Sequence, residues 1–571
     1  MNFEKNNLNL STSPYLRQHQ DNPIAWQEYS EEVVQYAQSK VLPLFISIGY
    51  ATCHWCHVMA NDTFSNTDVA EYMNENFICI KVDREQRPDI DSYCMNFIQA
   101  NYGQGGWPLN VVMTPDLKPF FATTYLASTP RGGMPGFVEA MTQVLDFYKE
   151  NKNKLSTFEP QSPQESTLDS VDLEQYIQQF DKENGGFVAN AKFPPHCSLL
   201  FLLSNEEAMA NPQISSWAKN SLDIMQNSGL HDHVGGGFYR YCVDPKWEIP
   251  HFEKMLYDQA MMLISYSLGY AIFKDDTYKE TISRILFSLE DTFKINDLYA
   301  SGHDADTNHE EGLTYLWTKS ELEQELGGNF KSFLKDYELI EFEGSNHLQG
   351  KHSSTLAYQL YETRKQREQP TIDTKILTSW NSLLGIAFCF VERFTEISTP
   401  VDELYNALLK QKDVRSSNNG EKQNDFFLED AASILLFQTY MFERGLTTKD
   451  ELSNQYATLQ TFQKDDNWIE NPNSDFTEIN APEFDHPIPS TFSLLEWALT
   501  RYSIIAGTET ENLSYKMPLN FDAHNYSADF ALNHSHFKSR ELPKDAPLLS
   551  IIEPSDENLV CHGGACRPIE Q

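Results

Sequence analysis

The stretch PLFISIGYATCHWCHVM, residues 43–59, leads from a short apolar run directly into two cysteines with two residues between them. A continuous apolar run of this length is typical of a central strand buried on both faces. The residues after it can continue as a helix, which places Cys53 at the positive end of that helix, where a thiolate is stabilised. Cys53 is then the candidate attacking thiol and Cys56 the resolving one, and His54 adds positive charge when protonated.

Two other chemistries use the same residues. Cys53-x-x-Cys56-His57 is also the attachment pattern of c-type haem, which is the weakest interpretation because the sequence shows no export signal. Cys53, Cys56 and His57 could instead bind zinc if further ligands converge from elsewhere, for example from Cys561 and Cys566. We therefore expect a redox-active dithiol without a cofactor, and zinc stays as the alternative.

The sequence around this motif alternates helix and strand patterns. SEEVVQYAQSKV predicts a helix capped by Ser30, FICIKVD predicts a second strand, and PLNVVMTPDLKPFFATTYL predicts a hairpin that turns at Pro115 and Asp116. Pro108 stands at the head of this hairpin, where a thioredoxin-like fold has a cis-proline beside its dithiol. Residues 1–150 are therefore predicted to form a thioredoxin-like α/β domain with Pro108 in its redox site.

The remainder of the chain changes character. Residues 151–171 are rich in Ser, Pro, Gln and Glu and are predicted to be a linker. Over residues 172–510 the strand patterns nearly vanish, and long helical patterns such as DQAMMLISYSLGYAIF and SWNSLLGIAFCFVERF take over. Helix pairs joined by loops rich in Gly, acids and aromatics predict an all-α toroid with its pocket at one end. Residues 511–571 are predicted to be an irregular segment that contains Cys561 and Cys566.

Several long segments resemble the spermatogenesis-associated protein 20-like family. They include SPYLRQHQDNPIAW, KVDREQRPDID, GGWPLNVVMTPDLKPFFATTYL, HVGGGFYRYCVDPKWEIPHFEKMLYDQA and the terminal CHGGAC. The resemblance covers nearly the whole chain. It implies a thioredoxin-like domain followed by an (α/α)6 barrel of the six-hairpin glycosidase type, similar to sugar 2-epimerases, in a family whose members mostly have no assigned reaction.

The segment from His233 to Ala260 carries candidate chemistry of the second domain. His251 and Glu253 are candidate acid and base groups, and Arg240 could hold a carboxylate or a ring oxygen. The rings of Tyr241 and Trp247 are suited to stacking on a sugar. The alternative is a structural loop that closes the barrel end, with Glu253 paired to Lys254 or Arg240.

Acidic and aromatic residues near other helix starts complete the candidate set. Asp304 and Asp306 could act as a catalytic carboxylate pair, and a solvated acidic loop is the alternative. Trp380 begins one apolar helix, and Glu429 and Asp430 begin another. If these loops gather at one end of the toroid, all three residues are candidate ligand-binding groups.

Charge and composition restrict the classes of partner that we expect for this protein. The net charge of −39, from 43 basic and 82 acidic residues, disfavours nucleic acid and anionic membranes, whose binding relies on Lys and Arg. The polar first residues and the lack of a long apolar window predict a cytoplasmic protein that does not enter membranes. The partner is then expected to be a protein disulfide, or a small molecule such as a saccharide.

Three hypotheses for function follow from these features. The first is a thiol–disulfide oxidoreductase whose barrel binds a partner or ligand. The second is a sugar-modifying enzyme, an epimerase, isomerase or glycosidase, that uses the barrel pocket. The third is a ligand-binding protein without catalysis. The sequence specifies neither the substrate nor the oligomeric state.

Overall fold

A computed structural model describes residues 2–160, 172–351, 354–423, 425–465, 467–485 and 487–508, together with the strands β22 (Leu559–His562) and β23 (Ala565–Pro568). The predicted linker, residues 151–171, and the predicted irregular segment, residues 511–571, lie in large part outside these ranges. β22 and β23 pair antiparallel with Cys561 opposite Cys566. Within the described ranges no helix combines the length and apolarity that crossing a membrane requires.

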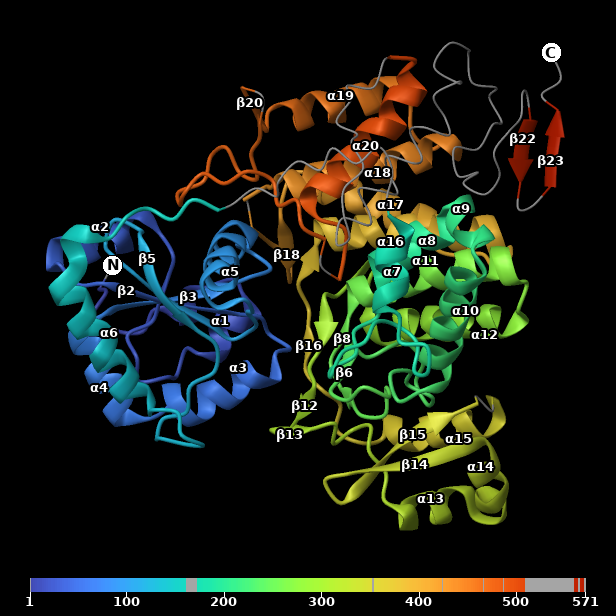
Figure 1. Cartoon of the computed structure of the whole chain (residues 1–571), viewed down its shortest axis with the longest axis horizontal. Helices are drawn as coiled ribbons and strands as arrows, with labels where there is room; N and C mark the ends of the chain where they lie inside the picture. The colour runs from blue at the N-terminus through green and yellow to red at the C-terminus, as the bar shows by residue number, and fades with distance from the viewer. Residues whose placement is uncertain are drawn as a thin grey trace.

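The N-terminal domain is built on a five-stranded sheet with the order β1-β3-β2-β4-β5 (Figure 1). Its strands are β1 (Gln27–Glu28), β2 (Leu44–Gly49), β3 (Ile78–Asp83), β4 (Leu109–Met113) and β5 (Pro119–Thr123). β2 runs parallel to β3 and antiparallel to β4, and β4 and β5 form the predicted hairpin. Every residue of β2 is buried, as predicted for a central strand.

Helices cover both faces of this sheet. α2 (Glu31–Lys40) and α5 (Pro88–Tyr102) pack on one face, and α3 (His54–Met59), α4 (Thr67–Asn76) and α6 (Phe137–Asn151) pack on the other. The short helix α1 (Pro14–Gln18) precedes the sheet. Ser30 caps α2 by accepting a hydrogen bond from the Val33 N–H, as predicted. The thioredoxin-like α/β prediction is therefore confirmed.

The helical part has an inner and an outer layer. The described inner helices follow one another side by side: α8 (His196–Ser204), α11 (Leu256–Phe273), α16 (Thr378–Thr395), α18 (Leu428–Glu443) and α20 (Thr491–Ala506). The outer helices α10 (Pro212–Asn227), α12 (Asp276–Ser288), α17 (Val401–Leu408) and α19 (Lys449–Gln460) pack against them. The inner helices are apolar nearly all round, which is why they lie inside, whereas the outer helices bury one stripe. The predicted α/α barrel is confirmed.

Short strands gather at the end of the barrel that faces the N-terminal domain (Figure 1). They are β6 (Tyr241–Cys242), β7 (Pro250–His251), β8 (Lys254–Met255), β11 (Gly302–His303), β12 (Asp306–Thr307), β13 (Glu310–Glu311), β16 (Ile372–Asp373), β17 (Ile376–Leu377), β18 (Ser416–Asn418) and β19 (Glu421–Gln423). β8 leads directly into α11, and β17 leads directly into α16. These strands therefore fix the loops at the N-terminal ends of the inner helices.

A small lobe is inserted between α12 and α16. It consists of α13 (Lys319–Leu326), α14 (Phe330–Asp336), β14 (Tyr337–Phe342), β15 (Ser345–Gly350) and α15 (Ser354–Lys365), and it has its own small core. Its hairpin corrects the expectation that strand patterns nearly vanish after residue 171. The strand was missed because YELIEF does not alternate strictly, since Leu339 and Ile340 are both apolar, and a six-residue strand gives a weaker signal than the long helices around it.

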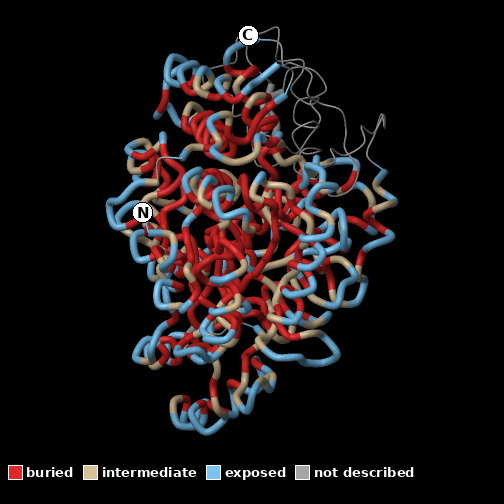
Figure 2. Tube along the Cα trace, turned by 90° about the vertical axis from the view of Figure 1, so that its left-hand side faces the viewer, coloured by how far each residue is buried: buried red, intermediate tan, exposed pale blue. Residues whose placement is uncertain are grey.

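The remaining elements are short connections. They are the helices α7 (Leu173–Gln179) and α9 (Glu206–Ala210), the hairpins β9 (Lys294–Ile295)–β10 (Leu298–Tyr299) and β20 (Gln463–Lys464)–β21 (Asn467–Trp468), the 3-10 turns Leu8–Leu10, Lys152–Lys154, Gly327–Asn329 and Leu409–Gln411, and the π turns Ala60–Phe64 and Leu289–Phe293. Figure 2 shows the buried residues running through the middle of the molecule, with exposed residues on the outer turns.

Candidate active site

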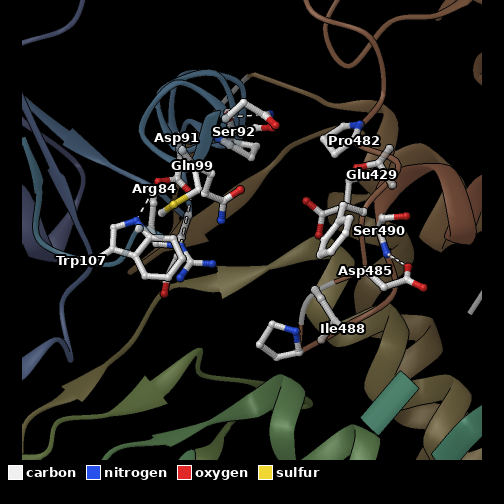
Figure 3. A pocket seen from close by; sticks show the side chains of 18 of the residues that line it. Arg84, Asp91, Ser92, Gln99, Trp107, Glu429, Pro482, Asp485, Ile488 and Ser490 are labelled. Atoms are coloured by element: carbon white, nitrogen blue, oxygen red, sulfur yellow. Dashed lines mark hydrogen bonds and ion pairs between the residues drawn. The ribbon is translucent and has the colours of Figure 1, made fainter. Parts of the chain in front are cut away.

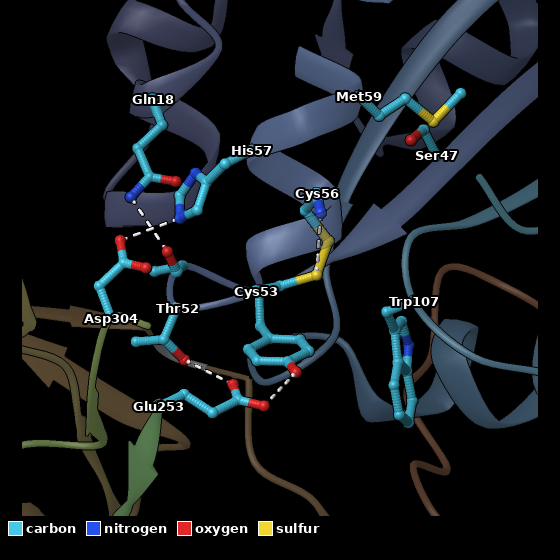
Figure 4. Close-up of a disulfide and its surroundings, with 12 residues drawn as sticks. Gln18, Ser47, Thr52, Cys53, Cys56, His57, Met59, Trp107, Glu253 and Asp304 are labelled. Atoms are coloured by element: carbon cyan, nitrogen blue, oxygen red, sulfur yellow. Dashed lines mark hydrogen bonds and ion pairs between the residues drawn. A yellow bond between two sulfur atoms is a disulfide. The ribbon is translucent and has the colours of Figure 1, made fainter. Parts of the chain in front are cut away.

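The CHWC motif forms the start of α3, and a disulfide joins Cys53 to Cys56 (Figure 4). Cys53 caps the helix, and its Sγ accepts a hydrogen bond from the Cys56 N–H at 3.2 Å. An N–H aimed at this sulfur at the positive end of a helix favours the thiolate after the disulfide is reduced. Cys53 is therefore the better placed nucleophile of the pair.

The proline at the head of the hairpin lies near the end of the strand that leads to the motif. The Trp107–Pro108 peptide bond is cis, as predicted. β4 begins at the next residue, and its Leu109 pairs with Ile48 of β2. Pro108 consequently lies beside the end of β2, where the chain leaves the sheet and enters the loop that carries the disulfide.

Two acidic residues of the barrel contact the histidines of the motif. His54 Nδ1 lies 2.7 Å from Asp306 Oδ1, and His57 Nε2 lies 2.9 Å from Asp304 Oδ2. Burial lowers the pKa of each histidine, but the hydrogen bond and charge of its aspartate outweigh burial and raise the pKa above the ordinary value. The two pairs tie α3 to the barrel and favour positively charged imidazoles beside the disulfide.

Glu253 ties the loop before Cys53 to the barrel (Figure 4). Its carboxylate accepts hydrogen bonds from the Tyr50 hydroxyl at 3.3 Å and from the Thr52 hydroxyl at 3.4 Å. Arg240 donates to the same carboxylate at 3.0 Å and also to the Tyr50 hydroxyl. Because Glu253 is fully buried, the arginine supplies the counter-charge that its burial requires.

A cavity of about 1080 Å³ lies between the two domains, and Cys53 lines it. One wall comes from the N-terminal domain and includes Trp107 and Arg84 (Figure 3). The opposite wall comes from the barrel and includes Glu429 and Ser490, next to the starts of α18 and α20. The disulfide therefore opens into a pocket that is shared by both domains.

Buried charges join the domains beside this pocket. The Lys375 ammonium of the barrel lies 2.9 Å from Asp83, 2.9 Å from Glu85 and 2.7 Å from Asp373. Burial lowers the pKa of Lys375, but the three carboxylates outweigh burial and raise it well above its ordinary value. The charge is therefore kept on Lys375 although water is excluded.

Arg415 makes a second connection of this kind. Its guanidinium binds Glu429 and Asp430, each at 2.9 Å, and its Nε donates to the backbone carbonyl of Glu85 at 2.8 Å. Asp430 is completely buried, whereas Glu429 lines the pocket. The acidic start of α18 therefore holds an arginine that contacts the N-terminal domain.

Comparisons with known proteins show what this chain is similar to. Residues 5–165 match a family described as "Protein of unknown function, DUF255" (Thioredox_DsbH). Spermatogenesis-associated protein 20 of Homo sapiens is 33% identical over 452 residues, which are 66% of this chain and 57% of the human protein. The resemblance to the spermatogenesis-associated protein 20-like family is confirmed. An uncharacterized protein of Caenorhabditis elegans, B0495.5, is 35% identical over 66% of this chain and 61% of its own length. The chain thus spans about three fifths of these relatives.

Solved structures are similar to parts of the chain. A D-mannose isomerase aligns over 58% of this chain and 80% of its own, with 11% identity and a TM-score of 0.38. The cellobiose 2-epimerase of Spirochaeta thermophila aligns over 63% and 82%, with 13% identity and a TM-score of 0.38. The DsbH oxidoreductase aligns over 22% and 85%, with 17% identity and a TM-score of 0.17.

The structure brings most of the predicted site residues together. Cys53, His251, Glu253, Arg240, Tyr241, Trp380 and Glu429 all line the pocket between the domains. His251 Nδ1 lies 2.5 Å from Glu311 Oε1, and its ring centre lies 5.6 Å from that of His54. Among the described residues there is no group of three or more His, Cys, Asp or Glu arranged to hold a metal ion.

Other predicted residues have different surroundings from those expected. Trp247 is fully buried and donates its indole N–H to the Asn184 carbonyl at 2.8 Å, so it offers no face for stacking on a ligand. Asp430 lies behind Arg415 and outside the pocket lining. Arg240 already holds Glu253, as the structural alternative for this segment foresaw.

The surroundings of Asp304 and Asp306 differ from the solvated loop that was the alternative for them. Asp304 is buried and Asp306 half-buried, and both face histidines of the other domain and not solvent. A solvated loop therefore does not describe Asp304 and Asp306, whereas residues 308–310 of the same segment are exposed. The two aspartates pair with His57 and His54 of the N-terminal domain.

Several residues of the site were not found from the sequence. Asp83, Glu85 and Asp91 all lie in KVDREQRPDID, a segment that the sequence analysis used only for the family resemblance. Lys375 lies between the short strands β16 and β17 and was likewise unassigned. Glu470, which lines the pocket and is buried, gave no sequence signal because a lone acid in a loop is usually exposed.

Proposed function

We propose that this protein catalyses thiol–disulfide exchange at Cys53 and Cys56. The observation that carries the proposal is the Cys53–Cys56 disulfide, whose Cys53 lies at the wall of a pocket. In the reduced state the Cys53 thiolate attacks a disulfide of the substrate, forms a mixed disulfide and expels the first substrate thiol. Cys56 then attacks Cys53 Sγ, which breaks the mixed disulfide, re-forms the Cys53–Cys56 disulfide and releases the second substrate thiol. The barrel contributes the other walls of the site.

The surroundings of Cys53 support its role as the attacking group. The Cys56 N–H points at the Cys53 sulfur, and His54 lies on the next position of the helix with a raised pKa. Both favour negative charge on Cys53. By contrast, the free cysteines Cys79 and Cys94 are buried, and burial raises the pKa of each thiol. They are consequently unsuited to exchange.

A redox titration tests the proposal. The full chain is equilibrated with mixtures of reduced and oxidised glutathione, and free thiols are alkylated and identified by mass spectrometry of peptides. We expect Cys53 and Cys56 to oxidise and reduce together, with a single midpoint. Failure of the pair to be reduced by any excess of dithiothreitol would sink the proposal.

Single variants test the order of attack. With Cys56→Ser, Cys53 is expected to accumulate a mixed disulfide with glutathione, because the resolving thiol is gone. With Cys53→Ser, the buried Cys56 is expected to form little mixed disulfide with glutathione. The control is Cys94→Ser, which removes a buried thiol of α5 and should leave the mixed disulfide of Cys56→Ser unchanged. Equal adducts on both single variants would contradict the assignment of Cys53 as nucleophile.

A further inference from the structure

The reactive sulfur is reached through the pocket between the domains. Cys53 is 3% exposed and Cys56 is 1% exposed, and Glu253 of the barrel contacts Thr52 just before the motif. Exchange requires the attacked sulfur to come within bonding distance of the attacking one. A sulfur this little exposed is poorly accessible to the disulfide of a folded protein, whereas the cavity of about 1080 Å³ has roughly the size of a small-molecule site.

The charges that line this pocket favour a cation. Of the described residues around it, ten are acidic and three are arginines. Each arginine has an acidic partner: Arg84 lies 3.7 Å from Asp91, Arg240 lies 3.0 Å from Glu253, and Arg415 lies 2.9 Å from Glu429. Two further acids of the lining are also paired, Glu85 with Lys375 and Glu478 with Lys464. The ten acids still outnumber these five cations, and the excess of carboxylates gives the cavity a negative potential.

Glu470 is a specific buried acid in this pocket. It is 1% exposed and lines the pocket, and neither of its carboxylate oxygens has a partner in hydrogen-bond geometry. Burial and the charge of Glu429 raise its pKa to about 8, while Thr491 and Arg415 oppose this shift less strongly. A buried carboxyl group without a full counter-charge is what a ligand ammonium group would satisfy.

We infer that the exchange partner of Cys53 and Cys56 is a small disulfide or thiol that carries an ammonium group and binds in the pocket between the domains. This inference rests on the proposed thiol–disulfide exchange and names its substrate class. Trp55 and Trp107, which also line the cavity, give the apolar part of such a ligand flat surfaces.

The reaction with a small disulfide RSSR balances without a further reactant. The Cys53 thiolate attacks one sulfur, forms the Cys53–S–S–R bond and breaks the S–S bond of the ligand, and the first RS⁻ leaves and takes a proton. The Cys56 thiolate then attacks Cys53 Sγ, re-forms the protein disulfide and releases the second RS⁻, which takes the other proton. The protein dithiol is oxidised and the ligand disulfide is reduced to two thiols. A thiol ligand runs the same steps in reverse.

A series of disulfides that differ in charge and size tests the inference. The reduced full chain is mixed with cystamine, 2-hydroxyethyl disulfide, 3,3′-dithiodipropionate or insulin, and the oxidation of Cys53 and Cys56 is followed with time. Each rate is divided by the rate of the same disulfide with free 2-mercaptoethanol. We expect cystamine to exceed dithiodipropionate by about tenfold or more after this correction, and insulin to react no faster than its background.

Glu470→Gln tests the role of the buried acid in the same assay. We expect the corrected ratio of cystamine to dithiodipropionate to fall several-fold, because glutamine cannot ionise when the ammonium binds. The matched control is Glu338→Gln, an exposed acid of β14 outside the pocket, which should keep the wild-type ratio. If Glu470→Gln does not fold, the rates of the differently charged disulfides with the unaltered chain are sufficient to test the inference.

The outcomes separate this inference from the proposed function. Reduction of insulin at a corrected rate like that of cystamine would overturn the small-molecule class. A dithiodipropionate rate that equals or exceeds the cystamine rate would overturn the preference for a cation. If no disulfide, cystamine and insulin included, oxidises Cys53 and Cys56, the proposed exchange activity itself fails.

Discussion

His57 of α3 and Asp304 of the barrel form an ion pair between the domains, with 2.9 Å between Nε2 and Oδ2. The pKa of His57 is raised, since the hydrogen bond and charge of Asp304 outweigh the opposite effect of burial. A raised folded-state pKa contributes stability that is fully present below the unfolded pKa of about 6.5 and is lost as pH rises through the folded value. The contact is therefore strongest in mildly acidic solution.

Asp304→Asn should accordingly destabilise the protein most at low pH. We expect a loss of about 1–3 kcal/mol at pH 6, because a buried imidazolium loses its charged partner, and a smaller loss at pH 9. Thermal unfolding at both pH values measures the difference. Glu478→Gln, which breaks the exposed pair with Lys464, is the control and should change little at either pH. A loss that does not depend on pH would argue against a charged His57.

Lys375→Met should be the most damaging of the charge substitutions. It leaves Asp83, Glu85 and Asp373 buried together without a cation, which costs about 3–5 kcal/mol for a buried pair broken on one side. Urea unfolding of the full chain measures this loss. Lys365→Met provides the contrast, since its pair with Asp291 is exposed and should contribute less than about 1 kcal/mol. Similar losses for both variants would mean that the buried cluster contributes no more to the free energy of unfolding than an exposed ion pair does.

Gly49→Ala should disturb the packing of Cys56 in the redox pair. A Cβ added at Gly49 would overlap the Tyr15 hydroxyl and would lie 2.7 Å from Cys56 Sγ, so both side chains have to move. We expect a destabilisation of about 1–3 kcal/mol, as for overpacking, together with faster alkylation of Cys56 in the reduced protein. Gly328→Ala is the matched control, because nothing lies within 4 Å of its added Cβ. Unchanged stability and unchanged alkylation would show that the space behind the disulfide is not restrictive.

Glu470 predicts a pH dependence that is separate from ligand binding. Its pKa of about 8 is raised mainly by burial, so the folded protein holds a proton that the unfolded chain releases near pH 4.5. The stability that Glu470 contributes is fully present below about pH 4.5 and is lost as pH rises through about 8. Glu470→Gln removes the loss, so the variant should gain stability relative to the unaltered protein at pH 9, by an amount on the order of a few kcal/mol. Thermal unfolding at pH 5 and pH 9 checks the sign, and a variant that gains nothing at pH 9 would contradict the raised pKa.

Local sequence patterns were sufficient for the redox motif and for the kinds of domain around it. The apolar run before Cys53, the cap at Ser30 and the cis bond at Pro108 each depend on neighbours a few residues away, and all three are present as predicted. The long apolar helices likewise specified an inner layer, since a helix that is apolar all round has to be buried.

The contacts between the domains could not be predicted in the same way. His54 and Asp306 are 252 residues apart, and Lys375 and Asp83 are 292 residues apart. Nothing in either local sequence indicates its partner, and a histidine or an aspartate by itself is more often solvated than paired. The surroundings of Trp247 were not predicted for a related reason. An aromatic residue in a glycine-rich loop suits ligand stacking and core packing equally, and its burial in the folded protein decides between them.

The position of Lys375 has a practical consequence for protein engineering. An excised segment of residues 5–165 would keep Asp83 and Glu85 but lose the ammonium group that neutralises them. It would also expose the face of α3 that Asp304 and Asp306 now cover. The thioredoxin-like part of this protein is therefore not a portable module, and grafts or fusions that preserve its chemistry have to carry the barrel loops along with it.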